Sequence, residues 1–293
     1  MPETAIPVSH FIDAGPVRLA VHEWGGDGPP ALLAHPTGFH GRIWAPVAQR
    51  LIARGRTVFS FDFRGHGDSS KSDTGYSWLG FADDVLAVTN HLGLAGEPTL
   101  LSVGHSKGGA ALVLAEAASP GTYPRLWLYE PIIFPSFEPL PRSDDFPLAR
   151  AARKRRNVWA STQDAFDAYS SKPPLNVMTE ESLRAYVDYG LRDRGDGVFE
   201  LKCRPEDEAE MYAMGPTHGA FAKLGDVRPP TLIVCGEHTE SIPPEMARTI
   251  ADQIPNASVE VMAGVGHFGP QEDPDRAVES MLRFAGATAT TPT

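Results

Sequence analysis

The chain contains little cysteine, no long apolar run and no leader-like start. Cys203 and Cys235 are the only cysteines among 293 residues and lack C-x-x-C spacing, so we expect two reduced thiols and no disulfide framework. No apolar stretch approaches the roughly 20 residues that a membrane-spanning helix needs. Residues 1–15 show neither the basic nor the apolar segment of a signal peptide. We therefore expect a cytoplasmic protein with no membrane span.

The chain is also poor in basic residues and in metal-binding patterns. Its 26 Lys and Arg against 37 Asp and Glu give a net charge of −11, which argues against nucleic-acid and anionic-membrane partners. No histidine pair has metal-ligand spacing, so no metal is expected. Gly264, Gly266 and Gly269 spell a dinucleotide fingerprint, but no strand–helix unit with an acidic residue about 20 positions on follows them. No cofactor is expected, and the partner is a small molecule.

What the chain does contain is centred on residues 98–118. The apolar run Thr99 to Val103 reads as a buried strand, and the Ala/Leu-rich stretch from Gly109 to Ala118 reads as a helix. Between them residues 104–108 spell G-x-S-x-G, a turn so sharp that the serine backbone is strained. The turn predicts an exposed Ser106 hydroxyl at a helix N-terminus, where backbone N–H groups bind a negatively charged oxygen.

Around this turn, strand and helix patterns alternate along the chain. Alternation of this kind predicts an α/β fold with a mostly parallel sheet and helices on both faces. It stops at Pro131, and helical fragments with many prolines and little strand pattern follow until about residue 225. We expect a core of residues 1–134 and 226–286, a helical cap of residues 135–225 inserted after the sixth strand, and a disordered tail of residues 287–293.

Three motifs in order make the chain resemble the α/β-hydrolase superfamily. Residues 104–108 fit its nucleophile elbow, residues 62–69 fit its D-x-R-G-x-G-x-S loop, and residues 266–274 look like its G-H-F…E-x-P histidine segment. The resemblance covers nearly the whole core and implies the α/β-hydrolase fold. A serine at the elbow, in place of aspartate, disfavours the haloalkane dehalogenase and epoxide hydrolase branches.

The chemistry of an elbow serine assigns further residues. A serine hydroxyl needs a base within hydrogen-bond reach, and His267, just past the last strand, is the best candidate. The oxyanion that develops needs two donors, expected from the backbone N–H groups of Lys107 and Thr37. The family usually has H-G-x where this chain has His35-Pro36-Thr37, and proline removes only its own donor. The Lys107 side chain is expected to be solvated.

The acid of the triad departs from the common pattern. The family usually places an aspartate after the strand that follows the cap, and here Thr239 stands in its place. Another branch puts the acid at the end of the preceding strand, where Glu130 lies. A carboxylate directly after an apolar run needs a partner, because burying it alone is costly. We favour Glu130 and keep Glu240 as the alternative acid, whereas Glu237 is expected to point outward.

The sequence therefore predicts a serine hydrolase that cleaves a hydrophobic carboxylic ester or lactone. Carbon–carbon bond hydrolase, cofactor-free haloperoxidase and a hydrolase-like binding protein with little turnover remain alternatives. Large apolar residues of the cap are expected to form its own core and to roof an apolar pocket over Ser106. A basic run at residues 150–156 reads chiefly as a solvated helix face, balanced by acidic residues 206–210, with carboxylate recognition as a lesser reading. Monomer and homodimer both stay open.

Overall fold

A computed structural model describes residues 6–286, and its centre is an eight-stranded sheet. The strands run in the order β1-β2-β4-β3-β5-β6-β10-β11. The first two pairings in this order, β1 with β2 and β2 with β4, are antiparallel and the others are parallel. The strand bounds are β1 Val8–Ala14, β2 Val17–Gly25, β3 Pro30–Ala34, β4 Thr57–Phe61, β5 Leu101–His105, β6 Leu126–Tyr129, β10 Thr231–Gly236 and β11 Ala257–Met262.

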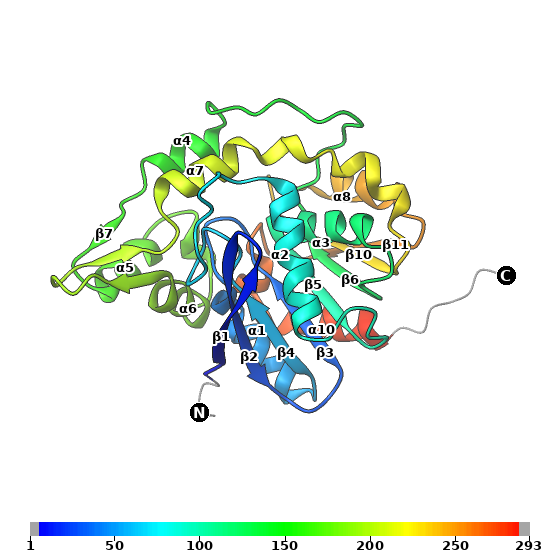
Figure 1. Ribbon diagram of the computed structural model, residues 1–293, viewed down its shortest axis with the longest axis horizontal. Coiled ribbons are helices and arrows are strands. Elements are labelled where there is room, and N and C mark those ends of the chain that lie inside the picture. Colours follow the sequence, from blue (N-terminus) through cyan, green and yellow to red (C-terminus); the bar gives the residue numbers. More distant parts are fainter. Residues whose placement is uncertain (1–5, 287–293) are drawn as a thin grey trace.

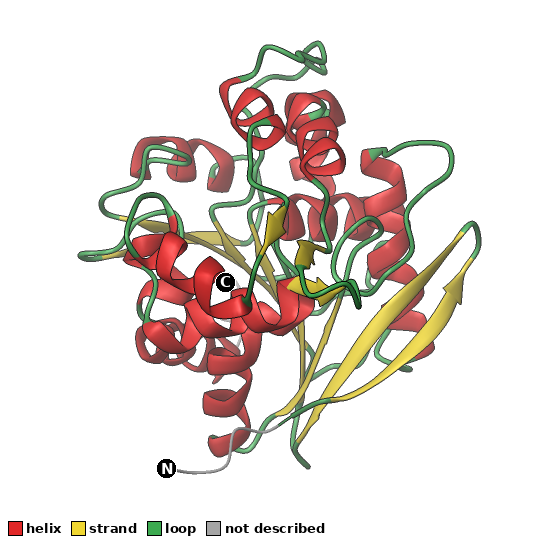
Figure 2. Ribbon diagram, turned by 90° about the vertical axis from the view of Figure 1, so that its left-hand side faces the viewer, coloured by secondary structure: helices red, strands yellow, loops and turns green. Residues whose placement is uncertain are grey.

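Helices cover both faces of this sheet (Figures 1 and 2). On one face lie α2 (Trp78–His91), α3 (Lys107–Ala118) and α8 (Pro244–Ala251), which share one apolar cluster. On the other face η1 (Gly41–Trp44), α1 (Ala45–Ala53) and α10 (Pro274–Gly286) share a second cluster. Successive residues of β6 alternate between the two: Leu126 and Leu128 face the first, Trp127 and Tyr129 the second. The predicted mostly parallel sheet with helices on both faces is confirmed.

Residues 130–230, between β6 and β10, form a separate group of elements that we call the β6–β10 segment. Its helices α4 and α7 pack against each other beside the sheet (Figure 1). It comprises α4 Pro147–Arg153, β7 Val158–Trp159, α5 Thr162–Ser170, η2 Leu175–Val177, α6 Glu180–Gly190, β8 Leu191–Asp193, β9 Phe199–Leu201, α7 Pro205–Ala213, η3 Gly215–His218 and η4 Ala220–Asp226.

The three-stranded sheet β7-β9-β8 in this segment is absent from the sequence interpretation. Its strands span two or three residues, too short for a period-two pattern to appear. The predicted disordered tail, residues 287–293, lies outside the described residues. Within residues 6–286, no helix combines the length and the apolar character needed to cross a membrane.

Candidate active site

Ser106 occupies the turn between β5 and α3 in a backbone conformation that side chains rarely adopt. Its φ is 54° and its ψ −114°, in the left-handed half of φ space, where L-residues are strained. The start of α3 packs closely against the end of β3. A Cβ added at Gly108 would lie 2.3 Å from the carbonyl oxygen of Ala34. Glycine is therefore required at that position. The strained elbow that the motif predicts is present.

The elbow is tied to the end of β6 by backbone hydrogen bonds. Ser106 N–H donates to the Tyr129 carbonyl at 2.9 Å, and Ile132 N–H donates to the Ser106 carbonyl at 3.2 Å. Glu130, between these two partners, also has a positive φ, 42°. Ser106 and Glu130 are the two non-glycine residues with this backbone strain in the described range 6–286. The fold thus holds the serine and the carboxylate-bearing residue side by side.

The Glu130 carboxylate is fully buried and meets His267. Its Oε2 lies 2.6 Å from His267 Nδ1. The same oxygen accepts the Thr239 hydroxyl at 2.8 Å, and Oε1 accepts the Gly236 N–H at 3.0 Å. With Nδ1 donating to the carboxylate, the other ring nitrogen of His267, Nε2, is available to accept a proton. The three donors satisfy this buried carboxylate. They are the partners that a carboxylate directly after an apolar run requires.

The loop that carries His267 is fixed on both sides. The Glu272 carboxylate accepts the N–H groups of Gly266 and Phe268, at 3.0 and 3.1 Å. The Tyr129 hydroxyl donates to the Gly266 carbonyl at 2.5 Å. No hydrogen bond joins the Ser106 hydroxyl to His267 among the described residues. Catalytic hydrogen bonds are often long in the absence of substrate and tighten when it binds.

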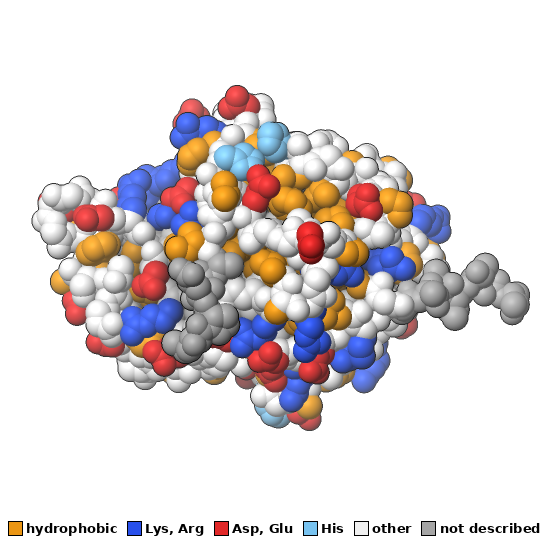
Figure 3. Space-filling model, turned by 90° about the horizontal axis from the view of Figure 1, so that it is seen from below, with side chains coloured by type: hydrophobic (Ala, Val, Ile, Leu, Met, Phe, Trp, Pro, Cys, Tyr) orange, Lys and Arg blue, Asp and Glu red, His pale blue; other side chains and the backbone are white. Residues whose placement is uncertain are grey.

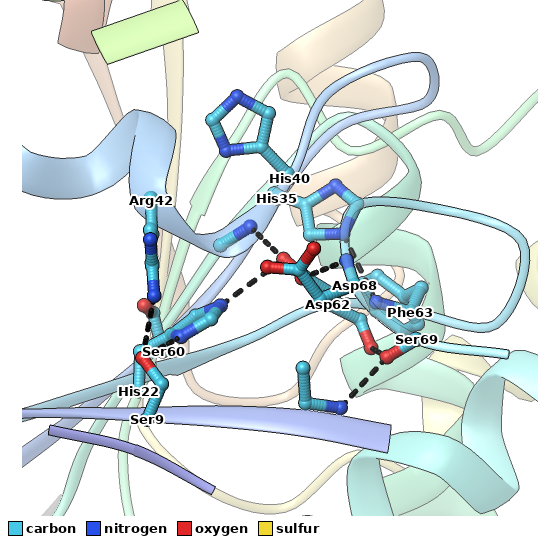
Figure 4. Close-up of polar contacts among 12 residues, drawn as sticks. Ser9, His22, His35, His40, Arg42, Ser60, Asp62, Phe63, Asp68 and Ser69 are labelled. Carbon is cyan, nitrogen blue, oxygen red and sulfur yellow. Dashed lines mark hydrogen bonds and ion pairs between the residues drawn. The ribbon is translucent and has the colours of Figure 1, made fainter. Parts of the chain in front are cut away.

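Both predicted oxyanion donors have a free N–H. Neither the Thr37 nor the Lys107 backbone N–H donates a hydrogen bond within the part of the chain that the structure describes. The Thr37 loop is held by His35, whose Nδ1 lies 2.7 Å from the Pro36 carbonyl and whose Nε2 accepts the Phe63 N–H at 3.1 Å (Figure 4). A buried donor without a partner is costly, so both N–H groups are available to a ligand that brings an acceptor.

The Lys107 side chain is buried, and the prediction that it is solvated is wrong. Its Nζ lies 3.2 Å from His66 Nε2 and 4.2 Å from the centre of the Phe63 ring. Burial lowers the pKa of this ammonium to about 7. The rings of Phe63, from the loop after β4, and Phe81, from α2, lie against the ammonium together with the His66 imidazole and take the place of water. The backbone N–H of Lys107, not its charge, is what it can offer at the elbow.

The two remaining carboxylate candidates do not reach His267. Glu240 is exposed, and no hydrogen bond links it to His267 in residues 6–286. Glu237 is also exposed and accepts the Gly264 N–H at 2.9 Å. Sequence reasoning missed Thr239 as a donor to Glu130. The available signal was a hydroxyl-bearing residue at the place where the acid usually stands.

A cavity of about 420 Å³ adjoins this group of residues. Phe39, two residues after Thr37, and Phe268, next to His267, form part of its wall. The Phe268 ring lies 5.3 Å from the His267 ring, measured between centroids. From the β6–β10 segment come Leu148, Ala151, Ala152, Lys154, Arg155, Arg156, Trp159, Tyr169, Lys172, Pro173, Pro174, Leu175, Tyr186, Glu208 and Tyr212.

The lining of this cavity bears on the expected apolar pocket. Aromatic side chains and four basic residues line it, so it is less apolar than expected, and since Ser106 is not in the lining the pocket over Ser106 stays a prediction. In residues 6–286 no group of three or more His, Cys, Asp or Glu side chains is arranged to hold a metal ion.

Comparisons with known proteins place this geometry in context. A family model described as the alpha/beta hydrolase family matches residues 31–280. A 2-(acetamidomethylene)succinate hydrolase of Mesorhizobium japonicum is 25% identical over 96% of both chains. A non-heme chloroperoxidase of Kitasatospora aureofaciens is 26% identical over 86% of this chain and 89% of its own. The crystal structure of an E-2-(acetamidomethylene)succinate hydrolase has a TM-score of 0.79 at 22% identity and covers 96% of this chain and 100% of that one.

Proposed function

Since the chain belongs to the alpha/beta hydrolase family, we propose that it is a serine hydrolase that cleaves a carboxylic ester or a lactone through an acyl-enzyme. The observation that carries the proposal is the contact of 2.6 Å between Glu130 and His267, on a turn tied to the strained elbow at Ser106. A nucleophile, a base and a group that orients the base are the components that acyl transfer requires.

In this mechanism the Ser106 hydroxyl attacks the substrate carbonyl carbon while its proton moves to His267 Nε2. The Glu130 carboxylate stabilises the imidazolium that forms. The negative oxygen accepts hydrogen bonds from the N–H groups of Lys107 and Thr37. The departing alkoxide takes the proton from His267 and leaves an ester on Ser106. A water molecule, deprotonated by His267, then attacks this ester, which releases the acid and restores the serine.

The β6–β10 segment serves in this proposal as a cap over the reacting groups. Its side chains Trp159, Tyr169, Tyr186 and Tyr212 line the cavity beside His267. Aromatic walls of this kind bury the apolar part of a small ligand. The substrate is therefore a small ester or lactone whose acyl or alcohol portion is apolar next to the reacting carbonyl.

One alternative on the same fold has a specific observation in its favour. The similarity to a non-heme chloroperoxidase keeps a cofactor-free haloperoxidase reaction under consideration. That reaction starts from the same serine with a peroxide in place of water. Hydrolysis and halogenation would therefore use the same residues and differ only in their substrates.

The proposal is tested with a panel of p-nitrophenyl esters, lactones and a vinylogous diketone, and with halide plus peroxide. Ser106→Ala is the matched blank. We expect ester or lactone hydrolysis that the Ser106→Ala variant lacks. Turnover of the diketone alone assigns a carbon–carbon hydrolase, and halogenation without hydrolysis assigns a haloperoxidase. If the native protein turns over every member of the panel no faster than Ser106→Ala does, the result supports a binding protein.

A further inference from the structure

The cavity beside His267 has a charge opposite to that of the molecule. The chain carries a net charge of −11, whereas Lys154, Arg155, Arg156 and Lys172 line the cavity with a single acidic residue, Glu208. On the face of the molecule seen in Figure 3, acidic and basic side chains are scattered among uncharged ones. A concave, partly enclosed site lined by one sign of charge concentrates ligands of the other sign.

The inner cation of the four, Arg155, is already neutralised. Its guanidinium forms an ion pair with Glu208. It also donates to the hydroxyls of Tyr186, at 2.5 Å, and Tyr169, at 3.2 Å. Glu208 in turn packs closely on Gly38, in the loop that carries Thr37. A Cβ added at Gly38 would lie only 2.3 Å from the Glu208 Oε1. This pair fixes the cavity next to the catalytic groups and adds no net charge.

The outer cations carry the surplus charge. Lys154 and Lys172 are exposed at the cavity rim, and within residues 6–286 neither amine makes a hydrogen bond or an ion pair. Arg156 is exposed as well, and its guanidinium lies 4.2 Å above the Trp159 ring. These residues come from two stretches, before β7 and after α5, that the fold brings to one rim.

We propose that the substrate bears a carboxylate on the portion that occupies this cavity, held by Lys154 and Lys172 at the rim. The proposal rests on the proposed hydrolase function and specifies its substrate class. An ester positioned at Ser106 extends past Phe268 along the aromatic wall, and its far end meets the two amines. A cavity of 420 Å³ suits a short chain of this kind, because small-ligand pockets start at about 300 Å³.

The test compares substrates of similar shape with and without the carboxylate. Monomethyl succinate, glutarate and adipate each have a neutral counterpart in which an isopropyl group replaces the carboxylate. Their hydrolysis is followed by acid release at low ionic strength. The variant Lys154→Gln/Lys172→Gln removes two charges from the rim, and Arg150→Gln/Lys223→Gln removes two exposed charges outside the cavity lining.

We expect the native enzyme to prefer at least one anionic ester over its counterpart. A charge pair at this half-enclosed rim contributes a factor of about 2 to 5, so the rim variant should lower kcat/KM for that ester about 4- to 25-fold, through KM. The neutral ester and the control variant should change by less than about twofold, because neither involves the rim pair. No anionic preference, or an equal loss for both esters, overturns the proposal while the hydrolase function stands.

A binding measurement separates the two proposals if no ester is turned over. Calorimetric titration of the Ser106→Ala protein with the three monomethyl esters is repeated in the Lys154→Gln/Lys172→Gln background. Binding that weakens in the rim variant supports anion recognition although the hydrolase proposal has failed. Binding that is undetectable, or the same in both proteins, overturns the anion proposal.

Discussion

The molecule contains two sets of serine, histidine and carboxylate side chains, and they differ in what surrounds them. One is Ser106, His267 and Glu130 at the carboxyl ends of the parallel strands. The other is formed by Ser9 on β1, His22 on β2 and Asp62 after β4 (Figure 4). The Ser9 hydroxyl lies 2.8 Å from His22 Nδ1, and His22 Nε2 lies 3.3 Å from Asp62 Oδ1.

In the second set the histidine contacts both the serine and the carboxylate, but the surroundings of the serine do not suit catalysis. Ser9 lies in a regular edge strand, directly opposite His22, without backbone strain. The Asp62 carboxylate accepts the N–H groups of Gly41 and Asp68, at 2.6 and 2.7 Å, and so anchors two loops. A Cβ at Gly41 would lie 2.8 Å from the His22 ring, so a substrate has little room there.

The comparison teaches that side-chain contacts alone do not identify a nucleophile. Ser106 has a strained backbone and, within residues 6–286, a free backbone N–H on the next residue, and a cavity begins at Phe268, the neighbour of His267. Those features supply oxyanion stabilisation and space, which contacts among a serine, a histidine and a carboxylate do not supply by themselves. In the second set His22 Nε2 lies within ion-pair distance of Asp62 but makes no hydrogen bond among the described residues. We therefore propose the first set for catalysis and the second for the structure of the sheet edge.

The largest expected effect separates the two serines. Ser106→Ala should lower kcat for the best ester by roughly 10⁴ to 10⁶, the scale for loss of a triad nucleophile. The matched variant Ser9→Ala should stay within about twofold of the native rate, since a surface side chain far from the chemistry contributes little. Steady-state kinetics decides, and a greater loss in Ser9→Ala would exchange the two assignments.

The next effect concerns the acid. Glu130→Gln should lower kcat by roughly 10² to 10⁴, because an amide cannot stabilise the imidazolium of His267. Glu240→Gln, a control of the same chemistry on an exposed side chain, should cost less than about twofold. If the two variants rank the other way, the acid is Glu240 and the loop moves on substrate binding.

A smaller effect is expected for the residue that holds the acid. Thr239→Val removes one of three donors to Glu130 and should lower kcat about 3- to 10-fold, the value of a single hydrogen bond. Thr239→Ser keeps the hydroxyl and should restore the native rate. Because Thr239 acts through Glu130, Thr239→Val should lower kcat while KM changes by less than about twofold, and Thr239→Ser should restore kcat. Equal rates in both variants would make Thr239 a packing residue.

The smallest effect is on stability at the second set. Ser9→Ala removes a part-buried hydrogen bond to His22 and should lower the free energy of unfolding by about 1 kcal/mol. Chemical denaturation monitored by tryptophan fluorescence measures this change, with Ser258→Ala, an exposed serine on the opposite edge strand β11, as the control. A loss of several kcal/mol would show that the sheet edge depends on this contact more than its exposure suggests.

Much of this arrangement is readable in the sequence. Strand and helix periodicity with three ordered motifs fixes the sheet, the elbow and the positions of Ser106 and His267. Glu130 is readable because a carboxylate at the end of the buried run 125–129 must find a partner. The short strands β7, β8 and β9 leave no pattern, and the burial of Lys107 depends on aromatic faces contributed by α2 and the loop after β4. The cationic rim is readable in part: Lys154 belongs to the basic run 150–156, but Lys172 joins it at one cavity only when the β6–β10 segment folds.

The central claim, that Ser106 is the nucleophile, is tested most directly by covalent labelling. A fluorophosphonate is incubated with the native protein and with Ser106→Ala and Ser9→Ala, and the modified residue is located by peptide mass spectrometry. Attack by an activated serine displaces fluoride and leaves a stable phosphonyl ester. We predict one label per chain on Ser106 in the native protein and in Ser9→Ala, and none in Ser106→Ala. A label on Ser9, or an unlabelled Ser106 in an enzyme that hydrolyses esters, would contradict this account.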